Sequence, residues 1–173
     1  MALEARISTK GRVGHDSLGT HENDLEGYDL RMDRCVQLTY PYHDTDVVEL
    51  RASAWNGRFG GATCLYVGQG DLAETATLLA GFPVGLHDRR EAMFGAFGPK
   101  FAGGAMSLKF SCVDGAGHCQ LHVTVEADYD RGDSLAQRVE MVCAFEPAAL
   151  DQFLRQMREL NSSLTGSAVL ALP

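Results

Sequence analysis

Two histidines four positions apart, His118 and His122, are the residues whose type and spacing most directly suggest chemistry. On a helix this spacing would place both imidazoles on one face, where they could bind one metal ion. The residues around them alternate between apolar and polar, however, which is typical of a strand. On a strand the two side chains lie roughly 13 Å apart at about 3.3 Å per residue, so no shared metal site is predicted.

The run His43-Asp44-Thr45-Asp46 offers an imidazole and two carboxylates. It has no glycine and no terminal glutamate, so the spacing of an EF-hand calcium loop is missing. A polar turn explains the run better, because Asp and Thr side chains bond readily to nearby backbone groups. No metal and no cofactor are predicted for the chain.

Nucleophilic catalysis has no workable arrangement in the sequence. Cys119 follows His118 directly, but consecutive residues of a strand point to opposite faces, so the two cannot act as thiolate and base. The chain has no G-x-S-x-G elbow, and the glycines Gly98, Gly103 and Gly104 lack the GK[ST] ending of a phosphate-binding loop. No catalytic residue is therefore predicted.

An acidic segment around Tyr129 is the remaining candidate site. Two interpretations stay open for it. It is either a solvated loop, or an anionic patch that attracts a basic partner and uses the tyrosine as a binding hot spot. On the second interpretation the partner-binding residues are Glu126, Asp128, Tyr129, Asp130 and Asp133.

The element that must position most of these residues is a β-hairpin between Gly104 and Ala127. Apolar and polar residues alternate on both sides of a glycine-rich tetrapeptide, which is a strong local hairpin signal. With Gly115 and Ala116 as the loop of a type II′ turn, residues 112, 110, 108 and 106 pair with 119, 121, 123 and 125. A slip by one residue would throw half of the apolar set to the wrong face, so the sequence specifies this register.

Further strands and two helices follow from the same kind of pattern. Strands are expected over residues 34–42, 47–55, 62–67, 93–97 and 137–145, the last beside the second strand of the hairpin. A helix is expected to start with a capping box of Asp71 and Glu74 and to stop at residues 81–83. The last helix starts at Pro147, and its apolar stripe is expected to cover the hairpin; the stripe consists of Leu150, Phe153, Leu154, Met157 and Leu160.

This order of elements lacks a regular β-α-β alternation, which excludes a Rossmann-type sheet. It predicts an α+β fold: a mostly antiparallel sheet of six to seven strands with two helices, the C-terminal one packed on the sheet. The single domain is expected over residues 29–160, after a mobile N-terminal tail at 1–28. Residues 161–173 form a C-terminal tail that is either disordered or an added edge strand.

Composition narrows the class of protein. A chain of 173 residues with 45% hydrophobic content can bury one substantial core. The net charge of −8 argues against a nucleic-acid binder and favours a basic protein partner. No apolar run approaches the roughly 18 residues of a membrane span, so we expect a cytoplasmic protein with no membrane contact.

The five cysteines of the chain lack CxxC spacing. The opposed pair Cys112 and Cys119 is either reduced or joined as a cross-strand disulfide.

Several spaced features between residues 34 and 160 occur together. They are Trp55 at the end of a strand, Phe82-Pro83 after a helix, a GG-x-x-x-L-x-F strand from Gly103, Gly117-His118 before the next strand, and an F-E-P-x-x-L-D-x-F segment from Phe145. This combination resembles the WapI-type immunity protein family and its uncharacterised relatives. The resemblance implies a cytoplasmic antidote that neutralises a polymorphic toxin by binding it, and it carries over no catalytic or binding residue.

The sequence therefore predicts a non-enzymatic binding protein whose partner is a basic toxin domain. Two other functions stay open. One is a small-ligand binder with an apolar pocket formed by Trp55, Phe59, Tyr66, Met93 and Phe94. The other is an enzyme with dispersed residues such as His118, His122, Glu126 and Asp128, which requires at least three of these side chains to converge.

Overall fold

A computed structural model describes residues 33–43, 47–129 and 137–173 of the chain. The predicted tail at residues 1–28 lies outside the described residues, as do Asp44, Thr45 and Asp46 of the histidine-aspartate run. No helix in the described part of the chain is both long enough and apolar enough to span a bilayer.

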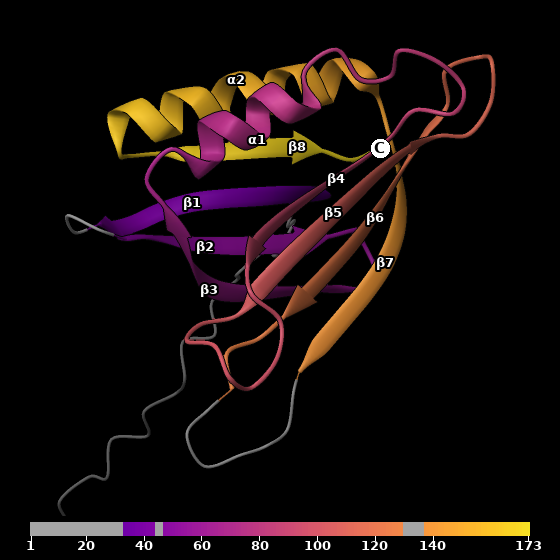
Figure 1. The fold of residues 1–173 in the computed structure, drawn as a ribbon. Coiled ribbons are helices and arrows are strands. Elements are labelled where there is room, and N and C mark those ends of the chain that lie inside the picture. The colour runs from indigo at the N-terminus through magenta and orange to yellow at the C-terminus, as the bar shows by residue number, and fades with distance from the viewer. Residues whose placement is uncertain (1–32, 44–46, 130–136) are drawn as a thin grey trace, which may run out of the picture. The chain divides into compact units, whose positions relative to one another are not determined.

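The described residues form an α+β fold with two antiparallel sheets of four strands each (Figure 1). The first sheet has the order β3-β2-β1-β8 and contains β1 (Cys35–His43), β2 (Val47–Trp55), β3 (Gly60–Gly68) and β8 (Ser167–Ala171). The second has the order β4-β5-β6-β7 and contains β4 (Arg89–Gly95), β5 (Ala105–Cys112), β6 (Cys119–Glu126) and β7 (Arg138–Phe145). The helices are α1 (Asp71–Leu79) and α2 (Pro147–Ser163). The α+β prediction is confirmed, but the single sheet of six to seven strands is wrong, because the strands divide into two sheets.

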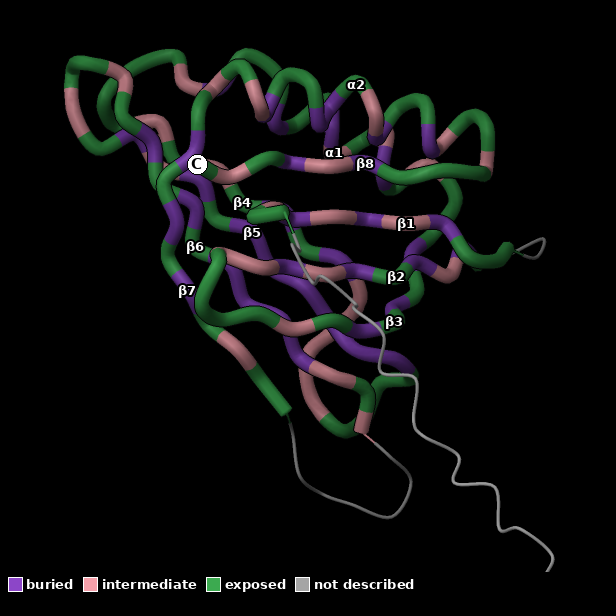
Figure 2. Tube along the Cα trace, turned by 180° about the vertical axis from the view of Figure 1, so that it is seen from behind, coloured by how far each residue is buried: buried purple, intermediate pink, exposed green. Residues whose placement is uncertain are grey.

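The two sheets share one hydrophobic core. Strands β2 and β3 pack against β5 and β6, and the strands of the two sheets cross at a large angle in Figure 1. Along most strands buried and exposed residues alternate, as Figure 2 shows, so one face of each sheet points into the core and the other points outward. Leu50 and Leu65 from the first sheet, and Leu108 and Leu121 from the second, are fully buried in this core.

The predicted hairpin register is confirmed, since Cys112, Phe110, Leu108 and Met106 pair with Cys119, Leu121, Val123 and Val125. The type of turn is wrong. Gly117 rather than Gly115 has a positive φ, at 90°, and its N–H donates to the carbonyl of Asp114. The Asp114 carboxylate also accepts from the N–H of Ala116 at 2.9 Å, so an aspartate, rather than a leading glycine, organises the turn.

Helix α2 carries the predicted apolar stripe, and all five residues of the stripe are buried. The helix does not serve as the lid of the hairpin, whose apolar face meets β2 and β3 instead. It packs on β8 and α1, because the chain returns after α2 and adds β8 beside β1. The edge-strand alternative for the C-terminal residues is thereby confirmed. The Gln156 side chain accepts from the N–H of Val169 at 2.8 Å, which covers an otherwise open edge of β8.

Helix α1 begins differently from the prediction. Its N-cap is Gly70, in a left-handed conformation with φ 95° and no side-chain cap, while the Asp71 carboxylate turns back to accept from the N–H of Gly68 at 2.7 Å. The helix ends shortly before residues 81–83, as predicted, and the side chain of Arg90 of β4 binds carbonyl groups at this end. The Arg90 guanidinium donates to the carbonyls of Leu78 and Ala80 at 3.0 and 2.7 Å and so ties α1 to the second sheet.

Candidate functional site

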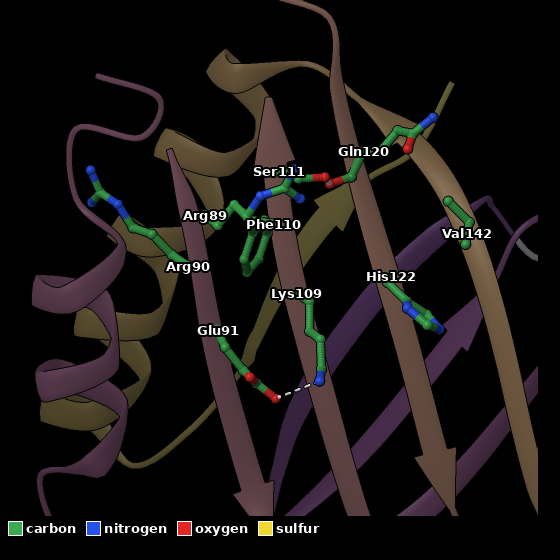
Figure 3. Close-up of a pocket in the computed structure, with 9 residues that line it drawn as sticks. All are labelled: Arg89, Arg90, Glu91, Lys109, Phe110, Ser111, Gln120, His122 and Val142. Carbon is green, nitrogen blue, oxygen red and sulfur yellow. Dashed lines mark hydrogen bonds and ion pairs between the residues drawn. The ribbon is translucent and has the colours of Figure 1, made fainter. Parts of the chain in front are cut away.

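The outward side of the second sheet forms a hollow of about 450 Å³ (Figure 3). We call this side of β4 to β7 the open face. Register places outward residues of the four strands in rows, and one such row is Glu91, Lys109, His122 and Val142. The hollow is lined by Arg89, Arg90, Glu91, Lys109, Phe110, Ser111, Gln120, His122 and Val142.

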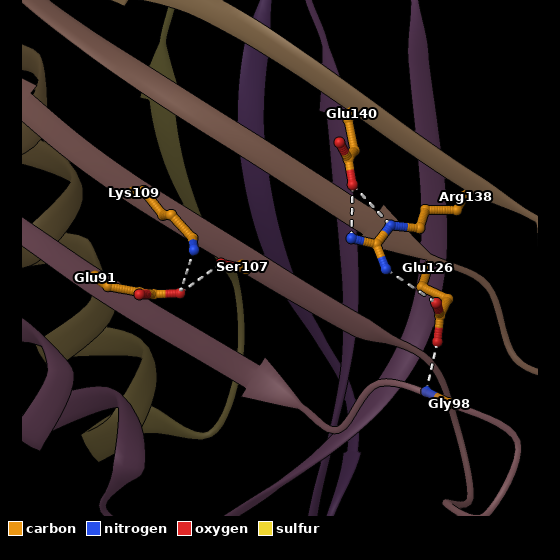
Figure 4. Close-up of polar contacts among 7 residues, drawn as sticks. All are labelled: Glu91, Gly98, Ser107, Lys109, Glu126, Arg138 and Glu140. Carbon is orange, nitrogen blue, oxygen red and sulfur yellow. Dashed lines mark hydrogen bonds and ion pairs between the residues drawn. The ribbon is translucent and has the colours of Figure 1, made fainter.

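Polar side chains of the hollow divide into paired and unpaired groups. Lys109 Nζ lies 3.3 Å from Glu91 Oε1, which also accepts from Ser107 Oγ at 3.2 Å (Figure 4). By contrast, the side chains of Arg89, Gln120 and His122 have no hydrogen-bond or ion-pair partner among the described residues. Their donors are free to bind a group that enters the hollow.

Three charged residues close the other end of the open face (Figure 4). Buried Glu126 accepts from the N–H of Gly98 at 2.6 Å and lies 3.6 Å from Arg138 Nη1. Arg138 in turn bonds Glu140 at 2.6 Å, and its guanidinium lies over the Phe97 ring at 5.2 Å from the centroid. These contacts hold the segment between β4 and β5 over this end of the sheet, so the open part of the face is the end that contains the hollow.

The predicted acidic site is only partly described. The Glu126 carboxylate is committed to contacts within the chain and has little exposed surface. Asp128 is exposed and Tyr129 is half-buried at the end of β6. Asp130 and Asp133 lie outside the described residues. Partner binding by the acidic segment therefore stays a prediction, and Asp128 and Tyr129 are its accessible described members.

The histidines lie in different settings. His118 belongs to the hairpin turn, where its Nδ1 lies 2.6 Å from Asp114 Oδ2, whereas His122 lies on the open face. The carboxylate of Asp114 raises the pKa of His118, and the hydrogen bond from His118 lowers the pKa of Asp114. Glu126 lies at the far end of β6 from His118, so the set proposed for a dispersed enzyme does not converge. Within the ranges that the structure describes, no three His, Cys, Asp or Glu side chains gather as metal ligands would.

The five residues of the proposed apolar pocket are also separated. Trp55 and Tyr66 lie on the outward side of the first sheet, and Met93 lies on the open face of the second. Phe94 is buried in the core and Phe59 is exposed in the β2–β3 connection. These side chains therefore do not line one cavity.

The opposed cysteines are buried, free thiols rather than a disulfide. Cys112 Sγ donates to the carbonyl of Asp114 at 3.3 Å, and Cys119 Sγ donates to that of Gly117 at 3.4 Å. Burial raises the pKa of Cys119, which keeps this thiol protonated and unreactive.

Sequence reasoning missed Arg89, Lys109 and Gln120 of the hollow. Lys109 and Gln120 occupy polar positions of the predicted hairpin, so their place on an outward face could have been deduced. Arg89 could not, because its strand was predicted to begin only at Met93.

Neither models of known families, nor curated proteins, nor solved structures gave a match to this chain.

Proposed function

We propose that this protein is a non-enzymatic binding protein that neutralises a protein toxin by contact through its open face. The observation that carries the proposal is the hollow across four strands, which holds three donor side chains that have no partner among the described residues, beside an exposed valine. The proposal agrees with the resemblance to WapI-type immunity proteins, which implies a cytoplasmic antidote.

The chemistry of the hollow suits a protein surface. Arg89, Gln120 and His122 can bond carbonyl or carboxylate oxygens of a partner without first losing contacts within the chain. Val142 is 59% exposed in the same row as His122, and Met93 is equally exposed nearby on β4. Apolar side chains among hydrogen-bond donors are the usual composition of a protein interface.

Charge acts at longer range. The net charge of −8 attracts a basic toxin domain and speeds its encounter with this protein. Asp128 and Tyr129 follow β6 at the end of the sheet opposite the hairpin turn, and in this proposal they bind basic groups of the same partner. The open face then supplies the short-range contacts.

If a neighbouring gene encodes a large secreted protein, binding to the C-terminal domain of that protein tests the proposal. The wild-type chain should bind that domain at low salt, and Val142→Glu should weaken binding roughly tenfold or more, because it replaces an exposed apolar side chain of the contact with a charge. Val84→Glu is the matched control, since Val84 is 82% exposed and its side chain does not line the hollow. Absence of binding at low salt would refute the antidote function, and equal binding by both variants would refute the use of the open face.

A further inference from the structure

Strand β7 lies at one edge of the second sheet and pairs with β6 alone. Its register with β6 is continuous over all eight residues of the strand, without a bulge. In the opposite views of Figures 1 and 2, no other described element runs along the side of β7 that faces away from β6. The first sheet approaches β7 at Val139, whose side chain packs on the core. The edge of β7 is therefore long, regular and open.

The backbone groups of β7 divide between the two sides of the strand. The N–H of Ala127 donates to the carbonyl of Gln137, which fixes the hydrogen-bond pattern along the β6–β7 pair. In an antiparallel pair every second residue directs its N–H and C=O groups to the partner strand, and the residues between direct theirs away. Glu140, Val142 and Ala144 are such intervening residues, and their backbone groups have no partner within the described chain. The edge thus presents a row of unpaired donors and acceptors.

The other outer strands have contacts that β7 lacks. The side chain of Gln156 covers β8, Gly104 is bonded to β3, and Arg90 joins β4 to α1. Natural proteins usually protect a sheet edge with lysine, proline or a bulge, because an open edge pairs readily with another strand. Strand β7 has none of these three features, and its exposed side chains include Val142 and Ala144. The edge is therefore suited to a further strand.

The sequence of β7 is complementary to itself. In a two-fold dimer the strand runs antiparallel to its own copy, so each residue meets a residue of the same strand. With Val142 at the axis, Val142 faces the second copy's Val142, and Glu140 faces the second copy's Ala144. Glu146 extends the strand, with φ −94° and ψ 134°, and faces the second copy's Arg138, whose side chain is 46% exposed. Opposite charges therefore meet at both ends of the pairing.

Other registers fit less well. An axis at Glu140 would place two glutamates directly opposite each other, which is destabilising. An axis at Met141 would place Glu140 opposite Val142 and would leave Arg138 opposite Ala144. The axis at Val142 is the one that pairs apolar with apolar residues and opposite charges with each other.

We propose that this protein forms a two-fold dimer in which the β7 strands of two copies pair edge to edge about Val142. The two four-stranded sheets then form one continuous sheet of eight strands, with both open faces on the same side. A strand pairing of this length is smaller than a standard interface of about 1,600 Å², so the dimer should dissociate on dilution. The pairing does not depend on the toxin-binding function and would occur whether or not that function is correct.

Sedimentation equilibrium of the full chain over a range of concentrations tests the dimer, and amide hydrogen exchange by NMR tests the edge. The weight-average mass should rise toward that of two chains as concentration increases. Over the same range, the amides of Glu140, Val142 and Ala144 should exchange more slowly, because pairing gives these N–H groups an acceptor. The amides of the equally exposed β4 edge, such as Met93, should not change.

Ala144→Pro removes one N–H from the open edge without removing a bond to β6, and an edge strand tolerates proline at such a position. It should weaken dimerisation roughly tenfold, because by symmetry the dimer loses this hydrogen bond twice. Ala144→Ser, which keeps the N–H, is the matched control and should dimerise as the wild type does. Ala144 does not line the hollow, so the variant leaves the lining of the open face unchanged.

Glu146→Lys provides a second variant that leaves the strand itself intact. It places a lysine opposite Arg138 of the second copy and should weaken dimerisation roughly threefold at low salt. Glu159→Lys makes the same change of charge on the exposed side of α2, away from β7, and should have no such effect.

Three results would overturn the proposal. The first is a chain that stays monomeric at every concentration, which would leave the edge to a strand of another protein. The second is a dimer in which the β7 amides keep their exchange rates. The third is dimerisation that is equally strong in the wild type, in folded Ala144→Pro and in Glu146→Lys.

Discussion

The backbone N–H of Gly104 donates to the carbonyl of Cys64 at 2.8 Å, and this bond fastens the start of β5 to the free edge of β3. A side chain at Gly104 would collide with the Thr63 hydroxyl and with the backbone carbonyl of Glu126. The two sheets are thus joined at a point where only glycine fits.

Gly104→Ala should therefore destabilise the protein by about 1–3 kcal/mol, because the backbone must shift to admit the methyl group. Urea unfolding followed by circular dichroism measures the change. Gly85→Ala is the control, since a methyl group there would meet no atom within 4 Å. Equal stability of the two variants would show that the junction does not limit the packing of the sheets.

The hairpin shows what local sequence can specify. Its register depends on alternation within 24 residues, and every predicted apolar pair is found. The division into two sheets depends instead on contacts between distant segments, such as Cys64 with Gly104 and β1 with β8. No local sequence pattern indicates pairing between such distant segments, which is why the sequence predicts one sheet and not two.

The open face was unpredictable for a related reason. It requires the register of four strands at once, and the charged start of β4 at Arg89 and Arg90 gives no strand signal. The Asp71 capping box failed because an aspartate can accept from a preceding turn as readily as from the helix N-terminus. The buried Glu126 was assigned to a surface patch because its partners, Gly98 and Arg138, are distant in sequence.

Glu126→Ala should lower the free energy of unfolding by about 1–3 kcal/mol, because it leaves the N–H of Gly98 and the Arg138 guanidinium without their acceptor. Glu91→Ala removes an ion pair whose two side chains are more than half exposed, together with the acceptor of the Ser107 hydroxyl, so a smaller loss of about 1 kcal/mol is expected. Chemical denaturation compares the two. A larger loss for Glu91→Ala would contradict the structural role assigned to Glu126.

The hairpin turn should respond to pH through His118 and Asp114. The raised pKa of His118 means that its stabilising contribution is present below its unfolded pKa and is lost as pH rises through the folded value. The lowered pKa of Asp114 means that its contribution is present above the ordinary carboxyl range and is lost as pH falls through the folded value. The ion pair is therefore complete between these two pKa values.

NMR titration of the imidazole ring tests this expectation. Asp114→Asn should lower the pKa of His118, because the hydrogen-bonded carboxylate that favours the imidazolium is removed. A His118 pKa that stays unchanged in this variant would mean that the two side chains are not paired in solution.

Tyr40→Phe should raise the stability of the protein by about 1 kcal/mol, since it removes a buried hydroxyl that has no partner in the described chain. Tyr42→Phe should leave stability nearly unchanged, because the Tyr42 side chain is exposed. Thermal unfolding of both variants provides the measurement. A loss of stability in Tyr40→Phe would reveal a hydrogen bond to that hydroxyl.

Replacing Arg89 and replacing Arg90, which are adjacent at the start of β4, should affect the stability of the protein differently. Arg90 donates to two carbonyls at the end of α1 and lies 2.9 Å from Asp88, whose pKa it lowers, so Arg90→Ala should destabilise the protein by about 1.5–3 kcal/mol. Arg89 lines the hollow without a partner among the described residues, so Arg89→Ala should change stability by less than about 0.5 kcal/mol and should instead weaken partner binding. Parallel unfolding and binding measurements separate the two roles. If Arg89→Ala unfolds the protein as readily as Arg90→Ala, then Arg89 belongs to the scaffold and not to the open face.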